Sequence, residues 1–282
     1  MNGLHELPLV IFTVLAQSVV GAFLLFAIVL FTTEDKHYRV YVHKAMFVLL
    51  ALLGIGFIAS ITHLGSPLRA FNALNRVGES MLSNEIATGA LFFALAGIYW
   101  LFAILDKLPK AFGRFLLVCA SAMGLIFMYM MNKVYHISTV PTWHTSFTTW
   151  GFYLTIILAG FTLGYGLLHS ERPDAKVVSW VPTLVSITTL VAATVIIYQG
   201  FALSTVVTSA QKATALVPDF ATLSALRFVL LGLAIACLFY VLHKPASWMS
   251  KLCAVLLVFA AEMIGRTLFY GLHMTVGMAV GA

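Results

Sequence analysis

Histidine, arginine and glutamate lie close together around the connection between two long apolar segments. His63 follows the first segment, Glu85 begins the second, and Arg69 lies early in the stretch between them. An imidazole titrates near neutral pH, and a partly buried carboxylate can accept or relay a proton. Together the three side chains, at the same depth along the helices, could carry out proton transfer. Each alone is also typical of a polar residue at a helix end.

A second polar group lies in the last apolar segment, EMIGRTLFYGLHM. Glu262 and Arg266 are four residues apart, so they share one face of a helix. Because each would cost roughly 2.5–3.5 kcal/mol if unpaired near a bilayer centre, we expect a buried ion pair. Tyr270 and His273 continue the same stripe toward the helix end. The stripe is interpreted either as an internal pair that fixes packing or as a candidate proton path or ligand site.

Composition decides which elements must position these groups. Of 282 residues, 61% are apolar and only 9% are charged, and the mean hydropathy is +1.00. Water-soluble domains have roughly half apolar and a quarter charged residues. The 16 basic residues are scattered between apolar segments without a basic run, which excludes a nucleic-acid-binding module. The sequence therefore predicts a membrane protein.

Apolar windows of about 20 residues predict membrane helices, since that length spans a bilayer core of roughly 30 Å. The protein has eight of them, with approximate bounds 7–31, 45–62, 85–105, 115–131, 150–168, 177–198, 223–242 and 251–274. The predicted fold is an all-α polytopic integral membrane protein, with residues 1–282 forming a single membrane domain of eight transmembrane helices.

The distribution of basic residues predicts the orientation. Ten of the 16 lie in alternate connections on one side: Lys36, Arg39, Lys44, Lys107, Lys110, Arg114, Arg172, Lys176, Lys244 and Lys251. Positive connections stay cytoplasmic, so both termini are expected to be periplasmic. The long connections 63–84 and 199–222 would then be periplasmic as well, which makes that face the expected docking surface for a partner.

The connection before Glu85 is expected to lie flat in the membrane interface over residues 66–82. Ser66 and Pro67 form a typical helix start. The apolar residues after them are expected to share one helix face, opposite the polar residues. These apolar residues are Leu68, Phe71, Leu74, Met81 and Leu82.

No haem or metal is expected in this protein. A membrane b-type haem usually needs histidines well inside the membrane, whereas all nine histidines here lie near the ends of the apolar segments. Cys119, Cys237 and Cys253 stand singly and make no metal-ligand motif.

Several long segments resemble the membrane anchor subunit of bacterial dimethyl sulfoxide reductase. In order along the whole sequence, they include HELPLVIFTVLAQ, HLGSPLRAFNALNRVGESMLSNEIATG, VPTWHTSFTTWGFYLT and EMIGRTLFYGLHMTVGMAV. The resemblance implies an eight-helix, haem-free protein of the bacterial inner membrane that oxidises menaquinol as its bound substrate. It also implies two partners on the periplasmic face, a molybdopterin catalytic subunit and an iron–sulfur electron-transfer subunit, which carry the metal cofactors.

The resemblance also assigns site residues. The family's quinol site includes a histidine after the second helix, an arginine in the next segment and a glutamate at the start of the third helix, which match His63, Arg69 and Glu85. We expect His63 to be the principal proton acceptor, Glu85 a second acceptor or relay, and Arg69 to orient Glu85 or the quinone. Phe71 is expected in the apolar wall around the ring.

Two other functions fit the same sequence. The protein could anchor a related reductase of the selenate or polysulfide type, or it could be a proton or small-molecule transporter that uses Glu262 and Arg266 as its relay. An anchor subunit would be inactive without its redox partners, whereas a transporter would work alone. An enzymatic activity of the isolated protein is therefore not expected under the anchor interpretation.

Overall fold

The computed structural model describes residues 6–63, 67–168, 178–207, 212–244 and 247–274, with the side chains of 63 and 67–71 outside the description. Within these ranges the elements are α1 Leu7–Thr32, α2 Lys36–His63, the 3₁₀-helix η2 Pro67–Arg76, α3 Met81–Ile104, α4 Lys110–Val134, α5 Ser146–Thr155, the π-helix η3 Ile156–Phe161, α6 Thr162–Leu168, α7 Val181–Thr205, the 3₁₀-helix η5 Ala213–Ala215, α8 Phe220–His243 and α9 Trp248–Gly271.

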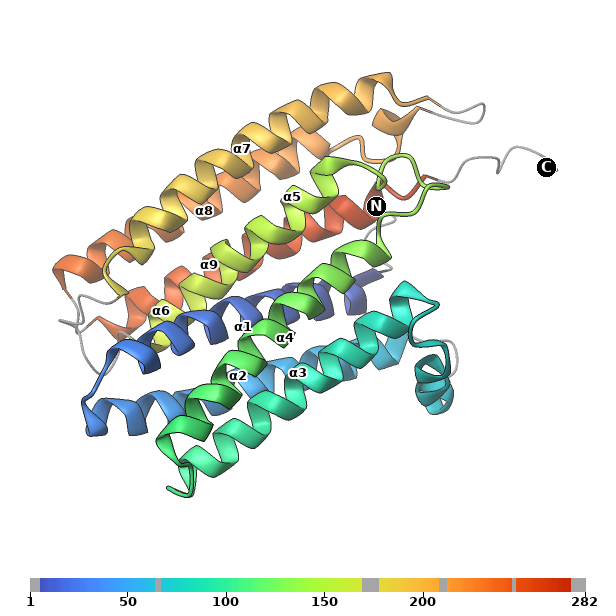
Figure 1. Cartoon of the computed structure of the whole chain (residues 1–282). Helices are drawn as coiled ribbons and strands as arrows, with labels where there is room; N and C mark the ends of the chain where they lie inside the picture. The colour runs from blue at the N-terminus through green and yellow to red at the C-terminus, as the bar shows by residue number, and fades with distance from the viewer. Residues whose placement is uncertain (1–5, 64–66, 169–177, 208–211, 245–246, 275–282) are drawn as a thin grey trace.

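The predicted fold class is confirmed. Eight helical spans among the described residues are long and apolar enough to cross a membrane, with α5, η3 and α6 forming one continuous span from Ser146 to Leu168. Neighbouring spans run in opposite directions, so α1 begins and α9 ends at the same end of the bundle (Figure 1). We call this the terminal end; it also carries the end of α2 and the start of α3.

Helix α1 is the centre of the bundle. It packs against α2, α4, α6, α9 and η3, and 78% of its apolar window is buried, compared with 22% for α3. In a protein surrounded by lipid, an apolar surface alone does not bring helices together, so close packing of small residues contributes more. The most buried helix is accordingly the one with the tightest backbone contact.

That contact joins α1 to the π-helix. A Cβ atom on Gly21 would lie 2.1 Å from the carbonyl oxygen of Ile156, and one on Gly160 would lie 2.6 Å from Cα of Gly21. No side chain fits at either position. Short π-helical turns within α-helices are frequent at functional sites, and this one directly follows Thr155, whose hydroxyl bonds to a buried carboxylate described below.

Several helices extend beyond the apolar windows. The second span was expected from residue 45, but α2 begins at Lys36, because hydropathy locates the hydrocarbon-facing stretch whereas backbone hydrogen bonding continues into polar residues. The sixth was expected over 177–198, but α7 begins at Val181 and ends at Thr205. Pro182 in its first turn is a typical helix start, since a missing N–H has no consequence there.

The expected interfacial helix over 66–82 is shorter than the sequence indicated. Residue 66 lies outside the described residues, η2 ends at Arg76, and Gly78 has a φ of +94°. That left-handed conformation ends the helical pattern, since residues other than glycine rarely adopt it. Met81 and Leu82 therefore belong to α3. Figure 1 shows η2 beyond the start of α3, set across the direction of the long helices.

Candidate functional site

The turn before α3 positions Glu85. The backbone N–H of Gly78 donates to Oδ1 of Asn84 at 2.7 Å, and the N–H of Ser80 donates to the carbonyl of Arg76 at 3.0 Å. These bonds connect the end of η2 to the first turn of α3. Glu85 follows in the second turn with only 3% of its surface exposed.

The Glu85 carboxylate is incompletely bonded. Its Oε1 atom is buried and has no hydrogen-bond partner among the described residues. A buried polar atom without a partner usually costs about 1–3 kcal/mol, so such an atom in a native fold indicates a ligand, a water or a functional role. Of the residues predicted to surround it, His63, Arg69 and Phe71 have side chains outside the described part of the structure.

Two tyrosines lie in the same neighbourhood. The hydroxyls of Tyr135, which follows α4, and Tyr270, in the last turn of α9, are 2.6 Å apart. Burial raises the pKa of Tyr135 well above its usual value, the nearby Tyr270 and Glu85 raise it further, and Arg266 opposes them. Tyr135 therefore stays a neutral hydroxyl, bonded to Tyr270 and close enough to Glu85 for the two groups to interact electrostatically.

An aromatic cluster holds Tyr135. The rings of Trp143, Phe152 and Phe269 have centroids 5.6, 5.1 and 5.4 Å from its own. The indole N–H of Trp143 donates to the carbonyl of Phe269 at 2.8 Å, which attaches the connection between α4 and α5 to α9. Aromatic pairs at such distances contribute about 0.5–1.5 kcal/mol beyond their burial, so this corner of the bundle is firmly packed.

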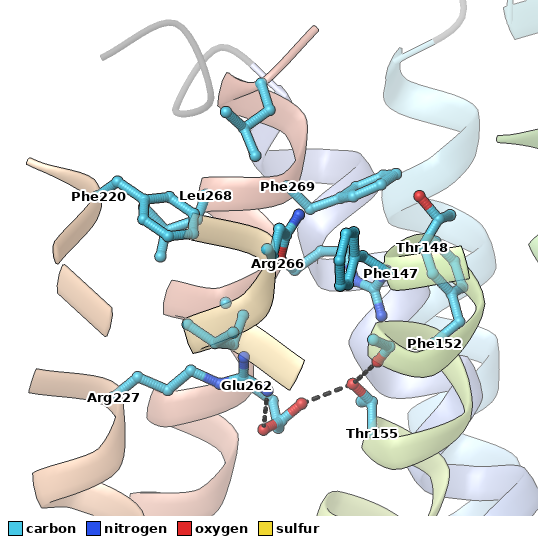
Figure 2. A pocket seen from close by; sticks show the side chains of 15 residues that line it. Phe147, Thr148, Phe152, Thr155, Phe220, Arg227, Glu262, Arg266, Leu268 and Phe269 are labelled. Carbon is cyan, nitrogen blue, oxygen red and sulfur yellow. Dashed lines mark hydrogen bonds and ion pairs between the residues drawn. The ribbon is translucent and has the colours of Figure 1, made fainter. Parts of the chain in front are cut away.

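The predicted pair between Glu262 and Arg266 is wrong in its partners. Oε1 of Glu262 accepts a hydrogen bond from Nη2 of Arg227 on α8 at 2.9 Å, and Oε2 lies 2.5 Å from the hydroxyl of Thr155 on α5. Figure 2 shows the carboxylate between these two groups. All three side chains are buried, so the carboxylate of Glu262 is satisfied on both oxygens by residues of neighbouring helices.

Arg266 has different partners. Its Nη2 atom donates to Oε1 of Gln17 at 2.6 Å, and its guanidinium carbon lies 3.6 Å from the centre of the Phe152 ring. The amide of Gln17 also donates to the carbonyl of Phe152 at 2.8 Å. Arg266 thus ties α9 to α1 and α5, and it stacks on an aromatic face in a way that guanidinium groups favour.

The stripe of polar residues on α9 does not form one continuous series of contacts. Glu262 bonds to Arg227, Arg266 to Gln17, and Tyr270 to Tyr135, while His273 packs its ring 4.8 Å from that of Trp143. The residues share a direction toward the terminal end, but each contacts a different neighbouring segment. The candidate proton path remains a prediction.

A small cavity lies beside Glu262, between α5, α7, α8 and α9. It has a volume of about 40 Å³, and its lining includes Thr155, Arg227, Glu262, Arg266 and the ring of Phe147 (Figure 2). Such a volume holds one or a few water molecules, whereas small-molecule sites usually occupy about 300–1,000 Å³. The cavity is too small for an aromatic substrate.

Sequence reasoning missed Arg227, Thr155, Gln17 and Tyr135. Arg227 lies two turns inside α8 and is buried. A stronger signal was available, because an arginine inside an apolar helix needs a buried acceptor and Glu262 was the obvious acidic candidate. The neutral residues gave no comparable signal.

Within the described ranges, no group of three or more His, Cys, Asp or Glu side chains could hold a metal ion. Cys119, Cys237 and Cys253 are free thiols.

The protein is similar to known proteins over nearly its whole length. The family described as DMSO reductase anchor subunit matches residues 1–272. The C subunit of anaerobic dimethyl sulfoxide reductase from Haemophilus influenzae is 52% identical over 280 residues, which cover 99% of each protein. Two Escherichia coli relatives belong to anaerobic dimethyl sulfoxide reductases. The YnfH subunit is 47% identical over 282 residues and 99% of each protein, and the C subunit is 46% identical over 289 residues, 100% of the protein described here and 99% of the relative.

Proposed function

The protein belongs to the DMSO reductase anchor subunit family, and on this premise we propose that it oxidises menaquinol and passes the electrons to an iron–sulfur partner subunit. As a member of this family it is a multi-pass membrane anchor of the inner membrane, in a complex whose partners carry molybdopterin and iron–sulfur clusters. The observation that supports quinol oxidation is Glu85, a buried carboxylate with a free acceptor oxygen among the described residues.

Quinol oxidation releases two electrons and two protons. In the proposed mechanism, His63 accepts the proton of one hydroxyl, and Glu85 accepts the other or relays it outward. Arg69 orients Glu85 or a quinone oxygen, and Phe71 covers the ring. The two electrons go to the iron–sulfur subunit, and the product is the quinone.

The site and the partners are proposed to share the periplasmic face. His63 and Glu85 lie at the terminal end of the bundle, and the basic residues concentrate in the connections at the opposite end, which the positive-inside rule assigns to the cytoplasm. Protons would then leave on the side where the electrons leave, so turnover would separate no charge across the membrane. Cysteines at Glu79 and at Lys107 test this with a membrane-impermeant thiol reagent in intact cells that lack the partner subunits, and only the first is expected to react.

The function itself is tested with His63→Ala in the assembled complex. We expect menaquinol-dependent reduction to fall at least a hundredfold, while reduction driven by an artificial dye that bypasses the quinol continues. His144→Ala is the matched control, because His144 lies at the same end and is exposed. Normal turnover by the His63 variant would overturn the assignment, and loss of dye-driven activity would give His63 a role in assembly instead.

A further inference from the structure

A second and larger cavity lies at the end of the bundle opposite Glu85. Its volume is about 600 Å³, within the range of small-molecule sites. It is enclosed by the end of α1, the start of α2, the end of α3 and the start of α4, whose ends meet opposite the protein's termini in Figure 1. None of the residues considered for quinol oxidation lines it.

Charged residues line this cavity unevenly. Four cations face two carboxylates, an excess of two positive charges: Lys36, Arg39, Lys110 and Arg114 against Glu34 and Asp106. Basic pockets between membrane helices are typical binding sites for anionic lipid headgroups.

Internal contacts hold these cations in place but leave them able to bind a ligand. Nη1 of Arg39 donates to the carbonyls of Leu30 at 2.6 Å and Thr33 at 3.3 Å, which holds the guanidinium at the end of α1. Glu34 lies 3.3 Å from Nζ of Lys110 and 4.0 Å from Nη2 of Arg114. These side chains are more than half exposed, and exposed pairs are worth little, so both cations can exchange Glu34 for a stronger anion.

The other walls of the cavity are apolar. Leu30 and Leu117 are buried, whereas Phe31 and Val40 are 40% and 49% exposed, so the apolar lining continues onto the outer surface of the helices. On the inner wall, Nε2 of His43 lies 3.1 Å from the hydroxyl of Tyr99, so these two buried groups satisfy each other. The cavity thus suits a ligand with a charged head and an apolar tail.

We propose that this cavity binds the headgroup of an anionic phospholipid from the surrounding leaflet. The phosphate lies among Lys36, Arg39, Lys110 and Arg114, and the acyl groups leave over Phe31 and Val40. A quinol ring fits less well, because it is neutral and would leave the excess of positive charge in the cavity without an anion. A phosphate alone would use the cations but leave the apolar wall uncovered.

The test compares two double variants of the intact complex in detergent after delipidation. Lys36→Gln with Lys110→Gln removes two cations from the cavity, whereas Lys44→Gln with Lys107→Gln removes two from the same end that do not line it. Each is titrated with phosphatidylglycerol in native mass spectrometry, with phosphatidylcholine as the neutral lipid. We expect the cavity variant to bind phosphatidylglycerol about thirtyfold more weakly, the usual effect of losing two basic contacts, and the control to stay within about threefold of the wild type.

Four outcomes would overturn the proposal. Equal weakening in both variants would mean a general surface attraction. Equal affinity for phosphatidylcholine would remove the anionic specificity. Displacement of the lipid by inorganic phosphate would indicate a soluble anion, and displacement by a menaquinone analogue would make the cavity a quinone site.

Discussion

Two buried glutamates, Glu262 and Glu85, differ in how fully their carboxylates are bonded. Glu262 and Glu85 are 2% and 3% exposed, so neither carboxylate is solvated by bulk water. Glu262 bonds to Arg227 and Thr155, whereas Oε1 of Glu85 has no partner in the part of the protein that the structure describes. Equal burial therefore does not imply an equal role: the paired carboxylate joins helices, and the unpaired one can bind a ligand or a proton.

The difference also concerns where the partners come from. Glu262 is held by Arg227 of α8 and Thr155 of α5, so both of its carboxylate oxygens are bonded before any substrate arrives. Glu85 lies one turn from the connection that carries Arg69, at the edge of the bundle. Membrane proteins usually retain intramembrane carboxylates for function, and of these two only Glu85 offers an oxygen for it.

The largest effect is expected from Arg227→Gln. It leaves the Glu262 carboxylate buried without its cation, which typically costs about 3–5 kcal/mol. Thermal unfolding of the purified complex should show this loss, and adding Glu262→Gln should recover more than half of it.

The same experiment distinguishes Arg227 from Arg266. Glu262→Gln should be rescued by Arg227→Gln but not by Arg266→Gln, because Arg266 bonds to Gln17. Rescue by Arg266→Gln alone would contradict the partners described here.

Glu85→Gln should affect turnover rather than stability. The amide keeps the shape but cannot accept a proton, so menaquinol oxidation should fall about a hundredfold, in the range typical of a lost general base. The melting temperature of the complex and the binding of a quinone analogue should change little. Glu79→Gln is the matched control, since Glu79 lies at the same end and is exposed. An equal fall in binding and turnover would make Glu85 a packing residue.

Thr155→Val should lower the free energy of unfolding by about 1.5–3 kcal/mol, the usual value for a hydrogen bond to a charged group. Thr162→Val is a sensitive control, because Thr162 is also buried in the same span and its hydroxyl has no hydrogen-bond partner among the described residues. We expect unfolding measurements to separate the two variants. Similar melting temperatures would mean that the contact between Thr155 and Glu262 contributes nothing.

The smallest effect is expected from Tyr135→Phe. Removing one hydroxyl from the pair with Tyr270 should cost about 1 kcal/mol of stability. Quinol oxidation should fall less than about fivefold if protons leave from Glu85 without passing through the tyrosines. If the rate of quinol oxidation fell as far as in Glu85→Gln, Tyr135 and Tyr270 would lie on the proton path from Glu85.

The sequence by itself determined the eight spans and identified Glu85 and Glu262 as residues that need an explanation. Apolar windows are sufficient for the spans, because a bilayer requires about 20 apolar residues per crossing whatever the neighbours are. The resemblance over the whole length added the quinol-site assignment of His63, Arg69 and Glu85. It did not reveal the second cavity, whose lining comes from four helix ends distant in the sequence.

Only the tertiary structure decided which groups contact one another. A spacing of four residues places Glu262 and Arg266 on one face of α9. The two side chains extend to neighbouring helices instead of to each other, and their partners there are Arg227, Thr155 and Gln17. The π-helix is a similar case, since it lies where Gly160 meets the backbone of Gly21, a contact between residues far apart in the sequence. Local sequence patterns determine which side chains share a helix face. The partners of those side chains depend on which distant helix packs against that face.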